Sequence, residues 1–344
     1  MKILHLIPSL TGGGAERQLA YLTHEMRRRG HQVRIAYKSD GPAPWQAEDL
    51  PAHRLTASRH RNPQFLREIV ALIRSWRPDV LQTWFVESDI VGGVAAALTR
   101  TPWVLREPSS GEFYAGRMKA SLRVMVARLA ADAIVANSEG GRAYWTRHAR
   151  PRLISNAVPI EDIDLVTPAD LGAVPSLVYA GRLESMKNVD VFLAAAAQLS
   201  EVRVIVCGIG PRRARLEQLA AELRIADRVR FTGYTRDIWP IVKGAALFVS
   251  LSDFEGSPNA VLEAFAAGTP ALLSDIAAHR AIADDRSAYF VPLGDVGATA
   301  AVMRQALADR SEAAARARNA RLRVASLSSA AMADAYEEVY RSLL

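Results

Sequence analysis

Short apolar runs rich in β-branched residues alternate with longer segments of helical periodicity along the whole 344-residue chain. Near-continuous apolar strands that alternate with amphipathic helices are typical of parallel sheets covered by helices on both faces. The pattern therefore predicts an α/β fold. Strands are expected at residues 2–7, 32–37, 79–84, 101–107, 132–138 and 152–158, and then at 176–182, 202–208, 229–234, 247–252, 270–275 and 288–293.

The pattern breaks at residues 159–175, PIEDIDLVTPADLGAVP, which are rich in Pro and Asp and have no helical period. The chain also exceeds the size at which one hydrophobic core usually stops growing. We therefore expect a linker here and two doubly wound parallel-sheet domains, residues 1–160 and 165–325. Because open parallel sheets bind ligands at the carboxyl ends of their strands, a cleft between the two sheets is the expected site.

Composition excludes several classes of protein. Half of the residues are apolar and 23% are charged, which excludes a disordered chain. The single cysteine, Cys207, lies in the apolar run VRVIVCG and is expected to be a buried strand residue. We find no cleavage site of a secretory signal and no apolar run long enough to span a bilayer. A cytoplasmic protein is the expectation.

Charge is distributed unevenly. Residues 1–160 contain 23 Lys and Arg against 13 Asp and Glu, a charge of +10, whereas residues 161–344 carry −3. A basic half can attract nucleic acid, anionic lipid or an acidic substrate, or it can be a solvated arginine-rich surface. We expect no nucleic-acid partner.

One basic segment, residues 113–130, has the composition of a helix that lies in a membrane interface. It mixes apolar residues with four cations, Arg117, Lys119, Arg123 and Arg128. The alternative is an amphipathic helix that faces the core. Peripheral attachment to the inner face of an anionic membrane is therefore a hypothesis.

Two glutamates, Glu255 and Glu263, flank a turn in the segment FEGSPNAVLEAFAAGTP at residues 254–270. Ser257 is a good N-cap, and Pro258 suits the first position of a helix. Gly268 and Pro270 are typical of a helix end. The segment therefore predicts a strand, a turn and a helix of about ten residues.

The start of this helix has the features of an anion site. The amides of Asn259, Ala260 and Val261 are expected to be free donors at the positive end of the helix, and Gly256 would let a ligand approach the backbone. Carboxylates beside a phosphate are tolerated where they accept hydrogen bonds from hydroxyls. A nucleotide sugar supplies hydroxyls on both sides of its diphosphate, in its sugar and in its ribose.

Cations that could balance such a diphosphate follow the first strand after the linker. The segment YAGRLESMKN contains Arg182 and Lys187, and arginine suits bidentate binding of phosphate. Gly208 and Gly210 form a further glycine turn between a strand and a helix. The order and spacing of these features carry more information than any one of them.

These residues bring out a family resemblance. SLVYAGRLESMKNVDVFLAAAAQL, VIVCGIGPRRARLEQLAAEL, VRFTGYTRDI and FEGSPNAVLEAFAAGTPALLSD are similar to successive donor-domain motifs of retaining glycosyltransferase family 4, also described as glycosyl transferases group 1. IPSLTGGGAERQLAYLTHEMRRRGHQVRI resembles the N-terminal strand, glycine loop and helix of that family. The resemblance covers nearly the whole chain. It implies a GT-B architecture, in which two Rossmann-like domains face a cleft, the C-terminal one holds the donor, and the last helix, 326–344, packs back onto the N-terminal domain.

The resemblance also implies roles for single residues. Arg182 and Lys187 would hold the diphosphate and stabilise the leaving group. Glu255 would bind the hydroxyls of the transferred sugar, and Glu263 would bind the ribose. Gly12, Gly13 and Gly14 would let the first helix approach the donor, and the alternative is a flexible turn. Further donor-side positions would be Gly208 and Gly210, the backbone of Gly256, Ser257, Pro258, Asn259, Ala260 and Val261, and, near the base, Tyr234 and Arg236.

The N-terminal half departs from the family pattern. Many relatives have a histidine after the third or fourth strand, where this chain has LQTWFVESD and VLREPSSGEFY. The acceptor-side candidates are therefore Glu87, Arg106 and Glu107. Arg106 could neutralise the diphosphate or bind an acidic acceptor, and Glu107 could orient an acceptor hydroxyl. The alternative is a buried ion pair that supports the cleft. His5 is expected to be a satisfied strand residue.

The leading hypothesis is transfer of a hexose from an NDP-sugar, UDP- or GDP-linked, to a hydroxyl of a carbohydrate, lipid-linked or small-molecule acceptor, with retention of anomeric configuration. Asp162 and Asp164 form an Asp-x-Asp pair, which binds metal in another class of sugar transferase. Because they lie in the expected linker, turn or cap chemistry is the better interpretation. We expect no metal and no further cofactor. The alternatives are a nucleotide-sugar 2-epimerase of the same architecture and a noncatalytic nucleotide-sugar-binding subunit.

Overall fold

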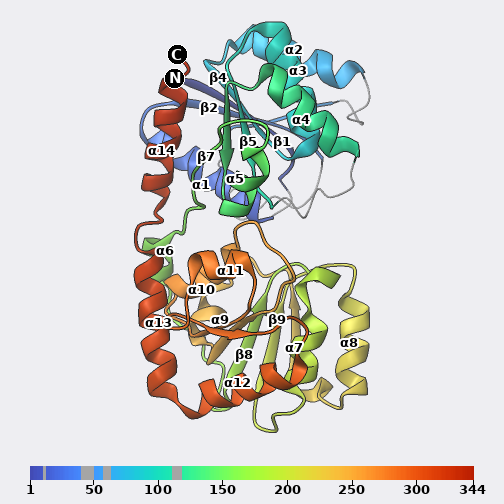
Figure 1. Ribbon diagram of the computed structural model, residues 1–344, viewed down its shortest axis with the longest axis vertical. Helices are drawn as coiled ribbons and strands as arrows, with labels where there is room; N and C mark the ends of the chain where they lie inside the picture. Colours follow the sequence, from blue (N-terminus) through green and yellow to red (C-terminus); the bar gives the residue numbers. More distant parts are fainter. Residues whose placement is uncertain (11–12, 40–49, 57–62, 111–117) are drawn as a thin grey trace. The chain divides into compact units, whose positions relative to one another are not determined.

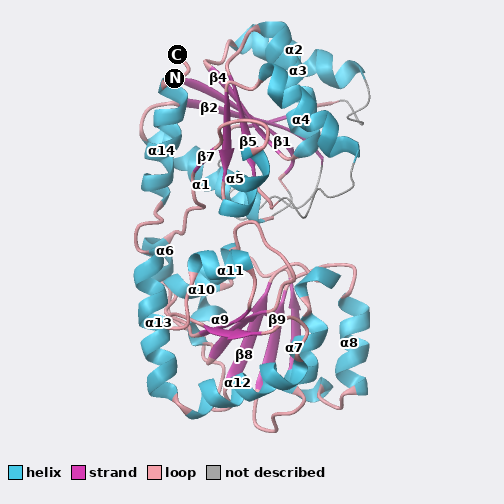
Figure 2. Ribbon diagram, viewed as in Figure 1, coloured by secondary structure: helices cyan, strands magenta, loops and turns pink. Residues whose placement is uncertain are grey.

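The computed structural model describes residues 1–10, 13–39, 50–56, 63–110 and 118–344. The chain divides into two compact units, Met1–Ala157 with Leu327–Leu344, and Val158–Ser326. Each unit contains a parallel sheet with helices on both faces (Figures 1 and 2). The predicted α/β fold with two Rossmann-like domains is confirmed.

The sheet of the first unit has the strand order β3-β2-β1-β4-β5-β6-β7, and its strand pairs are parallel. The sequence pattern misses β3, because its residues are exposed and form no apolar run. The last strand is shorter than expected, since only two residues pair with β6. The described strands are β1 (Lys2–Ser9), β2 (Gln32–Ser39), β3 (Ala52–Arg54), β4 (Val80–Trp84), β5 (Trp103–Glu107), β6 (Ala133–Ala136) and β7 (Arg152–Leu153).

Two apolar clusters cover the two faces of this sheet. One joins it to α1 (Gly14–Arg28) and α14 (Ser329–Arg341). The other joins it to α2 (Pro63–Trp76), α3 (Val86–Thr99), α4 (Met118–Ala130) and α5 (Glu139–Thr146). The C-terminal helix α14 therefore belongs to the first unit, as Figure 1 shows, although it is the last element of the chain.

The sheet of the second unit has the order β10-β9-β8-β11-β12-β13, again with parallel pairs. Each predicted strand of this half is present, and Cys207 is buried in β9 as expected. The strands are β8 (Ser176–Ala180), β9 (Arg203–Cys207), β10 (Val229–Gly233), β11 (Leu247–Ser250), β12 (Ala271–Ser274) and β13 (Tyr289–Val291).

Helices of the second unit also flank both faces of its sheet (Figure 2). A core cluster joins the sheet to α7, α8 and α12, and α10 lies against α6, α9 and α13. Their bounds are α6 (Ile160–Leu165), α7 (Val189–Ala196), α8 (Arg213–Glu222), α9 (Trp239–Gly244), α10 (Asn259–Ala266), α11 (Ala277–Ile282), α12 (Val296–Ala308) and α13 (Arg310–Val324).

The segment expected to be an irregular linker instead begins with helix α6. Ile163 is fully buried and anchors this helix. The Nζ atom of Lys243 donates to the carbonyl oxygens of Ile163, Asp164 and Val166 at 2.8, 3.0 and 2.7 Å. Arg321 on α13 holds both carboxylate oxygens of Asp164, at 2.6 and 2.7 Å. The Asp-x-Asp pair is therefore part of a helix, and its second aspartate is bound by an arginine.

Candidate active site

The strand order of the second unit reverses between β8 and β11. The chain enters the sheet at β8, adds β9 and β10 on one side, and then adds β11, β12 and β13 on the other. Loops that leave such neighbouring strands diverge and open a ligand site at their carboxyl ends. Arg182 and Lys187 follow β8, and Glu255 follows β11. The topology thus brings these three predicted residues to the switch point.

Lys187 and Glu255 form an ion pair across this switch point. Nζ of Lys187 lies 2.5 Å from Oε1 of Glu255. The hydroxyl of Ser252 donates to the same carboxylate oxygen at 2.7 Å. The side chains of Lys187 and Glu255 are only 17% and 14% exposed, so the pair is sheltered but reachable. One oxygen of the carboxylate is therefore held by two donors from different loops.

Arg182 follows β8 in the same loop as Lys187 and is open to solvent. Its guanidinium is 3.3 Å from a carboxylate oxygen of Glu184 and is 68% exposed. The hydroxyl of Tyr179 donates to the carbonyl oxygen of Arg182 at 2.9 Å and fixes the loop. Burial, followed by the charges of Glu255 and Glu184, raises the pKa of Tyr179, so this hydroxyl stays protonated as a donor. Arg182 is thus a cation on an anchored backbone.

A buried histidine, which no sequence motif predicts, supports the loop that carries Glu255. The carbonyl oxygen of Ser274 lies 2.9 Å from Nδ1 of His279, which makes Nδ1 the protonated nitrogen. The hydroxyl of Ser274 donates to the carbonyl oxygen of Ser252 at 2.6 Å. Burial lowers the pKa of His279, which keeps the ring neutral. A single sequence gives no indication of this contact, since His279 has no motif around it.

The helix start after Glu255 differs from the prediction by one residue. Helix α10 begins at Asn259 and its N-cap is Pro258, so Ser257 is not the cap. The amide of Asn259 donates to the carbonyl of Ser257 at 3.0 Å, and that of Val261 donates to the carbonyl of Pro258 at 2.9 Å. The expectation of three free amides is therefore wrong for two of them, because the turn closes on itself. Among the described residues, the amide of Ala260 has no backbone acceptor.

Glu263 is buried in the middle of α10. Its side chain is 5% exposed, and Oε2 accepts a hydrogen bond of 3.1 Å from the indole nitrogen of Trp239. Trp239 belongs to α9, which follows the β10 loop that carries Tyr234 and Arg236. Tyr234 is 45% exposed, and Arg236 is exposed as well. The second glutamate is thus oriented by a neighbouring element rather than by solvent.

The glycines after β9, which are expected on the donor side, also have a packing role. A Cβ atom on Gly208, whose φ is +147°, would lie 1.8 Å from the carbonyl oxygen of Gly181. On Gly210 it would lie 2.4 Å from the carbonyl oxygen of Leu183. Both contacts are with the backbone after β8. These glycines therefore allow the Arg182 loop to lie against the β9 loop.

The first unit has its own switch point, between β1 and β4. Gly13 is the N-cap of α1 after β1, and Gly14 is its first residue, whereas Gly12 lies outside the described residues. Glu87 lies in the first turn of α3 after β4, and its carboxylate accepts a hydrogen bond of 2.7 Å from Lys119. Gly13, Gly14 and Glu87 therefore lie at the carboxyl ends of adjacent strands.

Arg106 and Glu107 are both buried and do not pair with each other, because successive strand residues point to opposite faces of the sheet. Nε of Arg106 donates to the hydroxyl of Tyr336 on α14 at 2.9 Å, and Nη2 donates to Asn156 at 2.6 Å. Its guanidinium also lies over the ring of Trp84, 4.3 Å from the centroid. Arg106 thus ties the C-terminal helix to the sheet.

Glu107 belongs to a buried ionic network on the other face. Arg123 on α4 donates to Glu107 at 2.5 Å and to Asp89 on α3 at 2.6 Å, and these three side chains are fully buried. The indole of Trp145 adds a hydrogen bond of 2.9 Å to Glu107. Burial raises the pKa of Asp89 to about 6, against the opposing effect of Arg123. The geometry favours the supporting role that was the alternative for Glu107.

Two sequence expectations are corrected by this network and its neighbours. Arg123 was expected among the membrane-facing cations of segment 113–130, but it points into the core because Asp89 and Glu107 lie there. Arg117 lies outside the described residues.

The expectation that His5 is fully satisfied is also corrected. Only Nδ1 of His5 has a hydrogen-bond partner, the indole of Trp84 at 3.4 Å, and buried Nε2 has none among the described residues.

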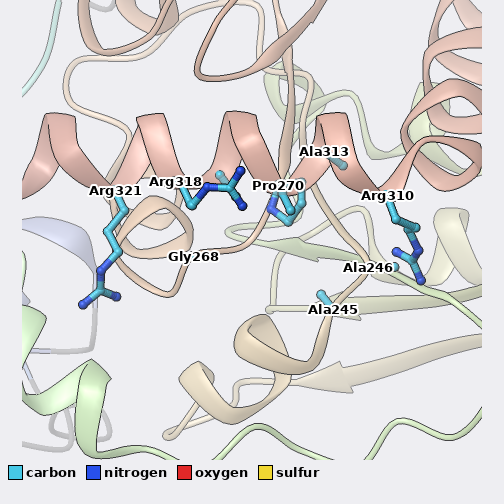
Figure 3. Close-up of a pocket in the computed structure, with 10 residues that line it drawn as sticks. Ala245, Ala246, Gly268, Pro270, Arg310, Ala313, Arg318 and Arg321 are labelled. Carbon is cyan, nitrogen blue, oxygen red and sulfur yellow. The ribbon is translucent and has the colours of Figure 1, made fainter.

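A pocket of about 320 Å³ lies at the other edge of the second sheet (Figure 3). Ala246, just before β11, and Pro270, just before β12, line it, so it lies at the amino ends of these strands. Figure 3 shows Arg318 of α13 extending toward Pro270. None of its lining residues is a predicted site residue other than the helix-end residues Gly268 and Pro270. The pocket is therefore separate from the Lys187–Glu255 pair.

Among the described residues, no group of three or more His, Cys, Asp or Glu side chains is placed to hold a metal ion. In the same part of the chain, no helix is long and apolar enough to cross a membrane.

Known proteins resemble this chain in both halves. Residues 12–162 match the family described as Glycosyltransferase Family 4, and residues 172–323 match Glycosyl transferases group 1. The lipopolysaccharide core biosynthesis glycosyltransferase LpsE of Rhizobium meliloti (strain 1021) is 29% identical over 325 residues, which cover 87% of each chain. LpsD of the same strain is 28% identical over 324 residues and 88% of each chain.

Solved structures share the fold. HepE of Anabaena in complex with UDP-glucose has a TM-score of 0.90 at 19% identity, over 99% of this chain and 100% of that chain. Sucrose-phosphate synthase of Thermosynechococcus elongatus has a TM-score of 0.86 at 23% identity, over 100% of this chain and 99% of that chain. Both halves of the chain match these families in order, the glycosyltransferase relatives are similar over most of their length, and the fold is GT-B, with two Rossmann-like domains. The chain therefore belongs to the family 4 glycosyltransferases.

Proposed function

We propose that this glycosyltransferase moves a hexose from an NDP-sugar, UDP- or GDP-linked, to an acceptor hydroxyl with retention of anomeric configuration. The observation that carries the proposal is the pairing of Lys187 with Glu255 at the switch point, with the exposed Arg182 in the same loop as Lys187. In open α/β sheets, nucleotides bind at the carboxyl ends of the strands next to such a switch point. That the similar protein HepE was solved with UDP and with UDP-glucose supports a UDP-sugar as the first donor to test.

The pair can serve both parts of such a donor. An ammonium group has three N–H donors, so Lys187 can keep its bond to Glu255 and also donate to a phosphate oxygen. Arg182 can bind the diphosphate in a bidentate manner. The carboxylate oxygen of Glu255 that is not held by Lys187 and Ser252 remains to accept hydrogen bonds from sugar hydroxyls. The sugar and the leaving group would thus be held by one connected set of charges.

In the proposed reaction, the bond between the anomeric carbon and the diphosphate oxygen breaks, and the acceptor oxygen bonds to that carbon on the same face. The acceptor proton passes to the leaving phosphate oxygen. Arg182 and Lys187 stabilise the negative charge that develops on the diphosphate, and Glu255 keeps the sugar aligned. No protein nucleophile is needed for this step.

The remaining predicted residues have supporting roles in the proposal. Glu263, oriented by Trp239, accepts hydrogen bonds from the ribose. The free amide of Ala260, with the backbone of Gly256–Ala260, lies near sugar and phosphate. Tyr234 and Arg236 lie near the base. Gly13 and Gly14 let α1 approach the donor, and Glu87 lies on the acceptor side.

The acceptor is proposed from the relatives. LpsE and LpsD are glycosyltransferases of lipopolysaccharide core biosynthesis, and their likeness extends over most of the chain. We therefore propose a role in the synthesis of a glycan, glycolipid or glycoconjugate in the cytoplasm, with a carbohydrate, lipid-linked or small-molecule acceptor.

Native mass spectrometry with UDP-, GDP- and dTDP-sugars tests the donor, and NMR of the product tests retention. We expect one nucleotide class to bind, to hydrolyse slowly without acceptor, and to give a product with the anomeric configuration of the donor. Conversion of the donor to its 2-epimer without acceptor would identify an epimerase instead. Binding without hydrolysis or transfer across a broad acceptor panel would identify a noncatalytic subunit. Transfer that stops with a chelator would contradict the proposed metal independence.

A further inference from the structure

Helices α3 and α4 of the first unit expose a group of large apolar side chains. The two helices lie side by side on one face of the sheet (Figure 1). The exposed fractions reach 84% for Met118 and 80% for Leu129. We call this group the α3–α4 surface, and its apolar members are Val94, Leu98, Met118, Leu122, Met125 and Leu129.

The apolar residues of α4 form one continuous stripe. Positions 118, 122, 125 and 129 recur at the spacing that places side chains on one face of a helix. The opposite face, which includes Ala120, Arg123 and Ala127, is buried against the first unit. The inward face of α4 is therefore fully used by the core and by the ionic network around Arg123. The outward stripe contributes nothing to that core, so its apolar character needs another explanation.

Cations flank the stripe on both sides. At a rotation of about 100° per residue, Lys119 lies on one side of the stripe and Arg128 on the other, and both are exposed. Arg100, directly after α3, is exposed too. Helix α4 has no acidic residue, and the acidic partner of Lys119 is Glu87 at 2.7 Å. An apolar centre between cations is typical of a helix that lies in the plane of an anionic membrane interface.

We propose that the α3–α4 surface binds the interface of a membrane that contains anionic phospholipid. Leu122, Met125 and Leu129 enter the boundary between headgroups and acyl chains, and Lys119 and Arg128 contact lipid phosphates. Charge favours this occupant over a second copy of the chain, because pairing two such surfaces would bring the flanking cations of both copies together. The basic first half, with its charge of +10, adds long-range attraction to an anionic surface. The proposal goes beyond sugar transfer and does not depend on the donor or acceptor.

Sedimentation of the full chain with vesicles tests this surface. Vesicles of phosphatidylcholine with one quarter phosphatidylglycerol are compared with pure phosphatidylcholine, at low and high salt. The wild type is expected to sediment with the anionic vesicles at low salt and to be released by salt. The double variant Leu122→Gln/Leu129→Gln is expected to bind roughly tenfold more weakly or worse, because two apolar side chains no longer leave water. Lys119→Gln/Arg128→Gln is expected to lose about fivefold per cation and to show a smaller salt effect.

A matched control is Leu165→Gln/Leu322→Gln, which alters two leucines of the second unit that are at least as exposed on average, at 86% and 74% against 43% for Leu122 and 80% for Leu129. This variant is expected to bind as the wild type does, and thermal unfolding checks that each variant is folded. The proposal is overturned if the wild type does not bind anionic vesicles at low salt, or binds neutral vesicles equally. It is also overturned if the control loses as much binding as Leu122→Gln/Leu129→Gln. A dimer that only Leu122→Gln/Leu129→Gln dissociates, without vesicle binding, would assign the surface to self-association.

Discussion

Lys187 and Glu255 approach to 2.5 Å although 67 residues separate them in the sequence, because each lies in the loop after one of two adjacent strands. In the proposed function Lys187 contacts the diphosphate and Glu255 contacts the sugar hydroxyls, and the structure joins these two side chains directly. Each charge is neutralised by the other while both side chains are only slightly exposed, and the pairing fixes the positions of the two groups. Each member therefore influences what the other can bind.

The first prediction concerns Lys187→Met. This change removes a donor to the diphosphate and leaves Glu255 without its cation next to the leaving group. A hydrogen bond to a charged group contributes roughly 1.5–3 kcal/mol, so the affinity for the nucleoside diphosphate should fall about tenfold to more than a hundredfold. Turnover should fall at least as much. Titration calorimetry with the diphosphate and an assay of sugar transfer measure the two effects.

Arg215→Gln is the control for Lys187→Met, since Arg215 lies in an exposed ion pair with Glu222 on α8. Its affinity and turnover should match the wild type. Unchanged diphosphate binding in Lys187→Met would show that Lys187 is only a structural partner of Glu255.

The second prediction separates the two glutamates. Glu255→Gln frees Lys187 for phosphate while weakening the grip on the sugar, so diphosphate affinity should stay equal or rise while turnover falls. Glu263→Gln should weaken binding of both donor and diphosphate, since both contain ribose. Each loss should be about tenfold to more than a hundredfold. Calorimetry of both variants with the diphosphate, beside their turnover, distinguishes the roles. The opposite pattern, with diphosphate binding lost only in Glu255→Gln, would reverse the assignment.

Apolar periodicity predicted most of the fold because the strands of a parallel sheet are buried on both faces and have few polar positions. The apolar pattern did not predict strand β3, because exposed residues at a sheet edge need no apolar run. The pattern did not predict helix α6 either, because contacts from Lys243 and Arg321, which are distant in the sequence, stabilise it. Local patterns describe what a segment prefers, and they do not include partners from other elements.

The same limit applies to the candidate site. Arg182, Lys187 and Glu255 could be chosen as candidates because strand ends and motif spacing place them in loops at neighbouring strands. The direction of the Arg123 side chain was not predicted, because apolar residues lie on both faces of α4 and make the buried face ambiguous. Its small neighbours Ala120 and Ala127, on the same face, were the available hint, since small residues let a helix approach its neighbour. The support from His279 could not be inferred from any local pattern.

The third prediction concerns Gly208→Ala. The new Cβ atom would lie 1.8 Å from the carbonyl oxygen of Gly181, which is backbone and cannot move aside cheaply. We expect the second unit to lose several kcal/mol of unfolding free energy, on the scale of severe core overpacking. Gly268→Ala is the matched control, because it also has a positive φ, +71°, but no atom lies within 4 Å of its Cβ position. Its loss should be about 1 kcal/mol. Equal urea midpoints for the two variants would contradict the close approach.

The fourth prediction concerns Arg123→Met, which leaves Asp89 and Glu107 buried without their cation. Removing one partner of a buried ion pair costs roughly 3–5 kcal/mol. Adding Asp89→Asn and Glu107→Gln should recover part of this loss, because neutral side chains need no cation. Arg142→Met, in an exposed pair with Glu139, should change unfolding free energy by less than about 1 kcal/mol. Denaturant unfolding measures the free energy of unfolding of Arg123→Met, of the triple variant and of Arg142→Met. If the added substitutions restore no stability, the packing of Arg123, rather than its charge, stabilises the first unit.

The last prediction follows from His5, which is fully buried and whose pKa is lowered from 6.5 to about 3, first by burial and then by the charge of Arg106. Between pH 6.5 and pH 3 the unfolded chain binds a proton at His5, whereas the folded protein keeps this ring neutral. His5 therefore contributes stability above pH 6.5 that is lost as the pH falls from 6.5 toward 3. At pH 5 the loss should be roughly 2 kcal/mol. The variant His5→Asn keeps an acceptor for the indole of Trp84 but cannot titrate, so its stability relative to the wild type should rise by that amount between pH 7 and pH 5.

Taking the difference between the unfolding free energies of the two proteins cancels the opposite effect of Asp89, because its raised pKa is present in both. Exposed His53→Asn should show no such change in urea unfolding, and a pH-independent difference between His5→Asn and the wild type would show that the folded protein protonates His5 as readily as the unfolded chain does.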